Sequence, residues 1–146
     1  MKLFLILTLV TPFCGAAKFY IPNFKTNWHH AHEFCHSLGM ALVSIESQEK
    51  QEQLVKFIQT TDKLDESVRF WLGASDLAQS GTFTWFASSR QMTYQHWARN
   101  EPNRKDGEHC IELWNPHYDW GWNDNVCDYL DYPICESVEQ PCISEF

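Results

Sequence analysis

The amino-acid sequence predicts a single α+β domain, and three observations lead to that fold class. A short strand-like segment comes first, two stretches with helical spacing of apolar residues follow, and the second half carries short aromatic runs separated by polar loops. The length of 146 residues corresponds to one domain. A hydrophobic fraction of 44%, with 15% aromatic residues, is enough to fill one core and excludes a disordered chain.

Residues 1–17 are typical of a secretory signal peptide. Lys2 makes the start positive, residues 3–10 are apolar apart from one threonine, and small residues at 15–17 offer a cleavage site. The apolar run is far shorter than the roughly 20 residues that cross a bilayer, and a short N-terminal membrane anchor is the alternative interpretation. We therefore expect a secreted, extracellular protein without membrane insertion, whose folded domain begins at residue 18.

Two helices are predicted after a short strand at residues 18–21. The first helix begins after Asn27, which is a good N-cap residue, and ends at Gly39, a residue typical of helix ends. The second helix begins near Ser47 and presents an apolar face before a polar exit at residues 60–66.

Beyond the second helix the pattern changes to short β-type runs. The aromatic runs at residues 70–73 and 83–86 predict strands, because aromatic side chains are enriched in sheets. Residues 99–109 are polar and contain a proline and a glycine, so they predict a loop. Residues 110–114 and 132–135 predict the final strands.

The charge balance is acidic, with 19 Asp and Glu residues against 11 Lys and Arg and a formal net charge of -8. A protein that binds nucleic acid through its phosphates normally shows the opposite sign, so we expect no nucleic-acid partner. An excess of carboxylates fits either a calcium-binding protein or an ordinary solvated surface.

Oxygen-bearing side chains gather in the polar loop and in a Trp-Asn-Asp triplet that follows it. Calcium takes about six to eight oxygen ligands from carboxylates, amides and carbonyls, and three carboxylates nearly balance its charge. On composition alone, such a loop is more often a solvated surface than a metal site. The candidate ligands are Glu101, Asn103, Glu108, Asn123 and Asp124.

The order and spacing of several motifs resemble the C-type lectin domain family. The motifs are Trp71-Leu72-Gly73, Glu101-Pro102-Asn103 and Trp122-Asn123-Asp124, framed by four cysteines. The resemblance covers residues 18–136. It implies a double-loop α+β fold in which two helices flank short antiparallel sheets and a long loop carries calcium.

The resemblance also implies how the cysteines pair in disulfides. Removal of the signal peptide takes away Cys14 and leaves five of the six cysteines, which an oxidising compartment would join by disulfides. Sequence alone allows three pairings of four cysteines, and the resemblance implies Cys35–Cys135 and Cys110–Cys127. Cys142 is left in a tail at residues 137–146, where it suits an interchain disulfide of a homodimer; an unpaired or capped thiol is the alternative.

The resemblance also implies a binding mode. The five candidate ligands would hold one calcium ion and would contact the carbohydrate, whose hydroxyls coordinate the ion directly, and the Glu101–Pro102 bond would be cis. Glu-Pro-Asn is the family's mannose-type order, which favours glycans bearing mannose, fucose or N-acetylglucosamine. The galactose-type order, Gln-Pro-Asp, is absent.

An accessory calcium site of the family has a poor match here. Its ligands would fall at Asp76, Ser80, Arg104 and His109, with Glu108 shared. Arg104 puts a cation where an acid or amide is expected, so we expect no accessory calcium.

His32-Glu33-Phe34-Cys35-His36 matches the His-Glu-x-x-His motif of zinc proteases. The third ligand is missing, however, because the positions where it is expected are Leu42 and Lys56. We therefore expect no enzyme, although His32 and His36 could bind zinc adventitiously.

The expected function is recognition or agglutination of glycan-bearing surfaces, as in innate immunity. Two alternatives stay open at this point. One is a galactose-binding C-type lectin, and the other is a lectin-like domain that binds proteins instead of sugars.

Overall fold

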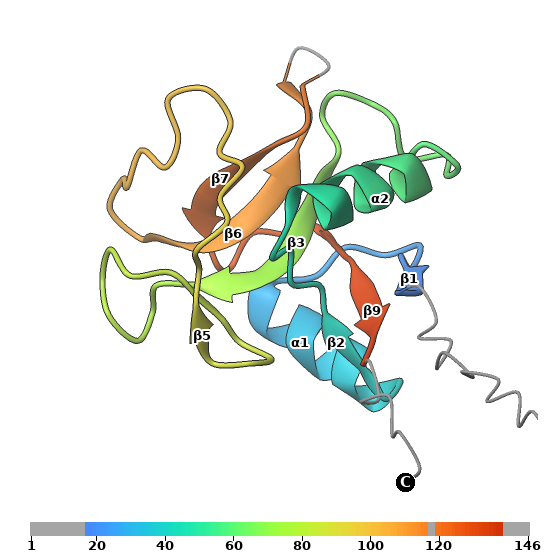
Figure 1. The fold of residues 1–146 in the computed structure, drawn as a ribbon, viewed down its shortest axis with the longest axis horizontal. Helices are drawn as coiled ribbons and strands as arrows, with labels where there is room; N and C mark the ends of the chain where they lie inside the picture. The colour runs from blue at the N-terminus through green and yellow to red at the C-terminus, as the bar shows by residue number, and fades with distance from the viewer. Residues whose placement is uncertain (1–16, 117–118, 139–146) are drawn as a thin grey trace, which may run out of the picture.

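Two sheets and two helices form the part of the chain that the computed structural model describes, which is residues 17–116 and 119–138 (Figure 1). This confirms the predicted α+β class with two helices and short antiparallel strands. Most of the predicted signal peptide and the tail with Cys142 lie outside the described residues. Within the described ranges, no helix is both long enough and apolar enough to span a lipid bilayer.

The smaller sheet joins the two ends of the described chain. Its antiparallel order is β1-β9-β2, in which Cys135 of β9 faces Tyr20 on one side and Leu42 on the other. The elements of this half are β1 (Phe19–Tyr20), α1 (Trp28–Ser37), β2 (Met40–Leu42), α2 (Gln48–Ile58) and β9 (Cys135–Ser137).

Both helices begin and end as the sequence predicts. The Asn27 side chain accepts a hydrogen bond of 2.9 Å from the His30 amide at the start of α1. Gly39 follows the end of α1 with a φ of 68°, which glycine adopts at little steric cost. Ser47 caps α2 by accepting a bond of 3.2 Å from the Lys50 amide.

The larger sheet has the order β5-β4-β3-β6-β7, and β8 pairs with β3 in parallel. The polar loop ends two residues earlier than predicted, because Glu108 already pairs with Val126. The strand predicted at residues 132–135 is divided at Ile134, and its two parts belong to different sheets. The elements are β3 (Arg69–Ser75), β4 (Thr84–Trp85), β5 (Arg90–Gln91), β6 (Glu108–Trp114), β7 (Gly121–Val126) and β8 (Tyr132–Pro133).

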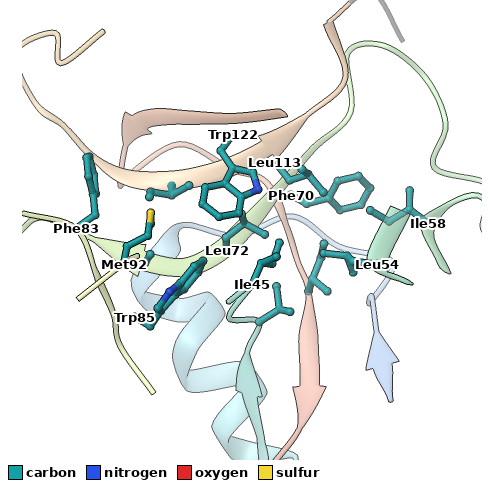
Figure 2. Packing of buried hydrophobic residues seen from close by; sticks show 14 residues of the cluster. Ile45, Leu54, Ile58, Phe70, Leu72, Phe83, Trp85, Met92, Leu113 and Trp122 are labelled. Atoms are coloured by element: carbon teal, nitrogen blue, oxygen red, sulfur yellow. The ribbon is translucent and has the colours of Figure 1, made fainter. Parts of the chain in front are cut away.

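The main core lies between the larger sheet and α2 (Figure 2). Trp122 of β7 is fully buried there, and its ring meets Trp85 edge to face at 5.7 Å between centroids. Leu54 and Ile58 bring the apolar face of α2 onto the same cluster. Trp122 therefore attaches the Trp-Asn-Asp triplet of the edge strand β7 to the core.

Both implied disulfides are present. Cys35–Cys135 links α1 to β9 across 100 residues of sequence. Cys110–Cys127 links β6 to the residue after β7 across 17 residues. A second buried cluster, which includes Trp28 and Trp71, surrounds these bridges.

Candidate functional site

A small depression of about 280 Å³ lies where β6 and β7 meet the long loop before β6. Four of the five predicted ligands line it. The full lining consists of Arg69, Glu101, Asn103, Lys105, Glu108, Trp114, Asn123, Asn125 and Tyr129.

Asp124, the fifth predicted ligand, attaches the loop to the sheet. Its carboxylate is fully buried on β7 and accepts hydrogen bonds from the backbone amides of Asn103, at 3.1 Å, and Arg104, at 2.9 Å. These bonds place the Glu-Pro-Asn segment against the Trp-Asn-Asp segment, although about twenty residues of sequence separate them. The structure therefore brings all five predicted residues into one neighbourhood.

The Glu-Pro-Asn segment folds back on itself. The Glu101–Pro102 peptide bond is cis, as the resemblance implied. The Glu101 carboxylate accepts one bond of 2.9 Å from the Asn103 backbone amide and another of 3.1 Å from its side-chain amide. The Asn103 side-chain oxygen in turn accepts from the Lys105 amide at 3.2 Å.

Carboxylates lie close to one another at the depression, which Arg69 and Lys105 also line. Burial raises the pKa of Glu101, and the negative charges of Asp124 and Glu108 add to the rise, while the bonds from Asn103 oppose it. One oxygen of Glu108, Oε2, is buried and has no hydrogen-bond partner among the described residues. A buried carboxylate oxygen without a donor is costly unless a cation or another group completes it.

The donor set fits a hard divalent ion only when its amides take part. Within residues 17–116 and 119–138, no three His, Cys, Asp or Glu side chains form a metal-binding group by themselves. The oxygens of Asn103 and Asn123 would have to complete the set that the carboxylates begin, and mixed carboxylate and amide ligation is what calcium accepts.

The sequence did not indicate a role for Glu112, whose side chain bonds two residues that line the depression. Glu112 of β6 is fully buried and accepts hydrogen bonds from Arg69 at 2.5 Å, Asn123 at 2.9 Å and Asn125 at 2.7 Å. An available signal was the charged residue inside the otherwise apolar run Ile111-Glu112-Leu113. Buried acids are rare unless they are paired.

Comparison with known proteins assigns the family. The family model described as "Lectin C-type domain" matches residues 24–137. The chain belongs to the C-type lectin domain family.

Relatives and solved structures agree with this assignment. The C-type lectin mosGCTL-7 of Aedes aegypti is 46% identical over 145 residues, which cover 97% of this chain and 95% of the relative. Salivary C-type lectin 1 of Aedes albopictus is 36% identical over 126 residues, which cover 83% and 82%. The C-type lectin domain of murine dendritic cell inhibitory receptor 2, solved with an N-glycan, superimposes with a TM-score of 0.69 at 26% identity, covering 85% of this chain and 91% of that one.

The side chains expected at the accessory position make contacts within the C-type lectin domain. The Asp76 carboxylate accepts a bond of 2.8 Å from the His109 ring and one of 2.7 Å from the Gly81 amide. The Arg104 guanidinium lies beside Gly81, and Ser80 is exposed. The acid at this position is thus already bonded within the lectin domain.

The zinc-protease motif lies on α1 of the lectin domain. The His32 ring packs against Trp28 and Phe86, with centroids 4.2 and 4.3 Å apart, whereas His36 is exposed. Burial, followed by the neighbouring His29, lowers the pKa of His32 to about 4. Leu42, where the longer motif needs a third histidine, is a buried core residue.

Proposed function

We propose that this C-type lectin domain is a secreted glycan-binding protein that works through one calcium ion held by Glu101, Asn103, Glu108, Asn123 and Asp124. The observation that carries the proposal is that four of these residues line one depression, while the Asp124 carboxylate bonds the long loop to β7 beside it. The N-glycan in the structure of the murine receptor domain supports a glycan as the ligand.

The chemistry of the five side chains suits both partners. When bound, calcium would supply coordination positions for adjacent sugar hydroxyls. A hydroxyl that gives one lone pair to the ion still has a proton to donate and a second lone pair to fill. Glu101 and Glu108 can accept that proton, and the amides of Asn103 and Asn123 can donate to the lone pair.

This order of acceptor and donor underlies the proposed selectivity. Glu101, Pro102 and Asn103 form the mannose-type order of the family, which suits equatorial 3- and 4-hydroxyls. We accordingly propose mannose, fucose or N-acetylglucosamine as the terminal sugar. Binding involves no covalent chemistry, so we propose no enzymatic activity.

Agglutination of glycan-bearing surfaces would require several copies of the domain. A shallow site that makes a few contacts binds a single sugar weakly, and linked sites gain avidity. A Cys142 disulfide would supply two copies, and the two intrachain disulfides suit the oxidising conditions outside the cell.

The test is retention of the purified protein on immobilised mannan in calcium, followed by elution with a chelator. We expect retention by the wild type and loss of retention in Glu108→Gln, which removes the charge of the carboxylate whose buried Oε2 has no hydrogen-bond partner among the described residues. Glu46→Gln is the matched control, because Glu46 is an exposed glutamate outside the depression. Retention that survives chelation would refute calcium dependence.

Columns of immobilised mannan, fucose and galactose separate the alternatives. Elution by free galactose but not by free mannose would assign the protein to the galactose-binding group. Calcium binding without retention on mannan, fucose or galactose resins would favour the protein-binding alternative.

A further inference from the structure

We infer that Glu112, which lies outside the proposed ligand set, is a positioning residue that orients the side-chain amide of Asn123 for calcium and sugar. Glu112 contacts neither ligand in this inference and acts only through Asn123. The inference rests on the proposed function, because the orientation of Asn123 matters to binding only if the depression binds calcium and glycan.

The strand register places the two side chains together. Glu112 of β6 and Asn123 of β7 are directly paired in the antiparallel ladder, and Asn125 lies two residues farther along on the same face. Glu112 Oε1 accepts from the Asn123 amide nitrogen at 2.9 Å, and Oε2 accepts from the Asn125 amide nitrogen at 2.7 Å. Both oxygens of the buried Glu112 carboxylate therefore accept hydrogen bonds from side chains of β7.

The chemistry of a carboxylate allows only one orientation of the Asn123 amide. An ionised carboxylate can only accept, so the amide must turn its nitrogen toward Glu112. A rotated amide would bring its oxygen against the carboxylate in a buried place, where two unpaired acceptors are costly. The Asn123 oxygen and its second N–H are consequently free of Glu112, and Asn123 lines the depression.

Two further residues of opposite charge type, Arg69 and Asp131, lie next to Glu112. The Arg69 guanidinium pairs with Glu112 Oε1 and lies over the Trp114 ring, with 4.5 Å between the guanidinium carbon and the ring centroid. Burial and the neighbouring Glu112 raise the pKa of Asp131 to about 8, against the opposing charges of Arg69 and Lys25. Asp131 therefore holds its proton to higher pH than an ordinary aspartate, which reduces the negative charge beside Glu112.

The test is a double-mutant cycle on calcium affinity, measured by titration calorimetry with calcium alone. Glu112→Gln should weaken calcium binding by about tenfold, within the range usual for residues that orient a ligand, because the new amide no longer fixes the Asn123 nitrogen. Asn123→Asp alone should also weaken it, because two carboxylates then face each other. In the double variant Glu112→Gln/Asn123→Asp, the amide introduced on β6 can donate to the carboxylate introduced on β7, so its affinity should exceed that of either single variant.

Glu136→Gln is the matched control for general damage. Glu136 is also a nearly buried carboxylate, bonded to Lys50 and to the Ser44 amide, and it lies outside the depression. It should lose thermal stability while its calcium affinity stays within twofold of the wild type, a margin of about 0.4 kcal/mol. If Glu112→Gln weakens calcium no more than this control, or if the cycle is additive, the inference is wrong and the proposed function stands.

A measurement on the wild type keeps the inference testable even if Glu112→Gln does not fold. In NMR spectra one of the two Asn123 side-chain amide protons should exchange slowly with water, because it is bonded inside the protein, and rapid exchange of both would overturn the inference. If the wild type binds no calcium at millimolar concentration, the proposed function fails and the inference fails with it. The two failures are therefore distinguishable.

Discussion

Glu101 and Asn103 are the residues whose exchange should change sugar selectivity. The carboxylate of Glu101 accepts from Asn103 and lines the depression, so the order of acceptor and donor along the segment is set by these two side chains. The double variant Glu101→Gln/Asn103→Asp reverses that order and keeps the volume of both side chains. We expect mannose retention to fall at least about tenfold, the cost of about one good hydrogen bond, with a shift toward galactose. Competitive elution with the two free sugars measures the shift, and unchanged mannose retention would contradict the donor and acceptor argument.

Asp131 should make folding stability depend on pH in an unusual direction. Its pKa in the folded protein is about 8, above its ordinary value of 3.8, chiefly because it is buried and next because Glu112 is close. The folded state then binds a proton that the unfolded state has released, so this residue's contribution to stability is full below pH 4 and is lost as the pH rises toward 8. In Asp131→Asn that loss disappears, since the amide can donate to Glu112 at any pH.

The measurement for Asp131→Asn is a thermal melt of calcium-free protein at pH 5 and pH 8. Relative to the wild type, the variant should gain stability between these pH values, by on the order of a few kcal/mol. Parallel pH profiles of the two proteins would show that Asp131 is ionised in the folded state.

At the scale of elements, a close approach of two backbones explains why the Trp-Leu-Gly motif ends in a glycine, Gly73. The Gly73 amide donates to the Val43 carbonyl at 2.8 Å, so β3 passes very close to the chain after β2. A Cβ at this position would lie 2.6 Å from the Leu42 carbonyl oxygen, which is backbone and cannot move away easily. Only a residue without a side chain fits at this position of the motif without moving the neighbouring backbone.

Gly73→Ala should cost about 3 kcal/mol of unfolding free energy, at the upper end of the usual range for an overpacked site. Gly39→Ala is the matched control, because a Cβ there meets nothing within 4 Å and only the positive φ of 68° is unfavourable. The control should lose about 1 kcal/mol. Urea denaturation measures both, and equal losses would mean that the close approach at Gly73 relaxes freely.

The helices could be predicted from the sequence, whereas the strand that carries the site could not. Asn27 and Ser47 act locally as caps, so their role is visible in a few residues of sequence. β7 contains Asn123, Asp124 and Asn125, residue types that are depleted in strands. Their burial depends on bonds to β6 and to the long loop, and those contacts are set by a register that the sequence does not display. The same dependence explains why motif spacing indicated the five candidate ligands but did not indicate Glu112.

For the whole molecule, we expect the two disulfides to differ in role, one acting on global stability and the other on local order. Cys35–Cys135 joins the helix near the start of the domain to β9 near its end, and its closed loop spans most of the described chain. Cys110–Cys127 closes a short loop and lies beside Glu108 and Asn125, which line the depression. Sequence alone could not choose this pairing, because three pairings close loops of plausible length.

Removing each bridge by paired cysteine-to-alanine changes should separate the two roles. Loss of Cys35–Cys135 should lower the free energy of unfolding by about 4 to 5 kcal/mol, and loss of Cys110–Cys127 by about 3 kcal/mol, because the unfolded chain gains more freedom from the longer loop. Calcium affinity should follow the opposite order, since only the second bridge holds β6 to the end of β7 at the depression. Urea denaturation and calcium titration of the folded variants measure the two quantities. If the variant without Cys35–Cys135 also loses more calcium affinity, the site depends on the stability of the whole domain more than on its local bridge.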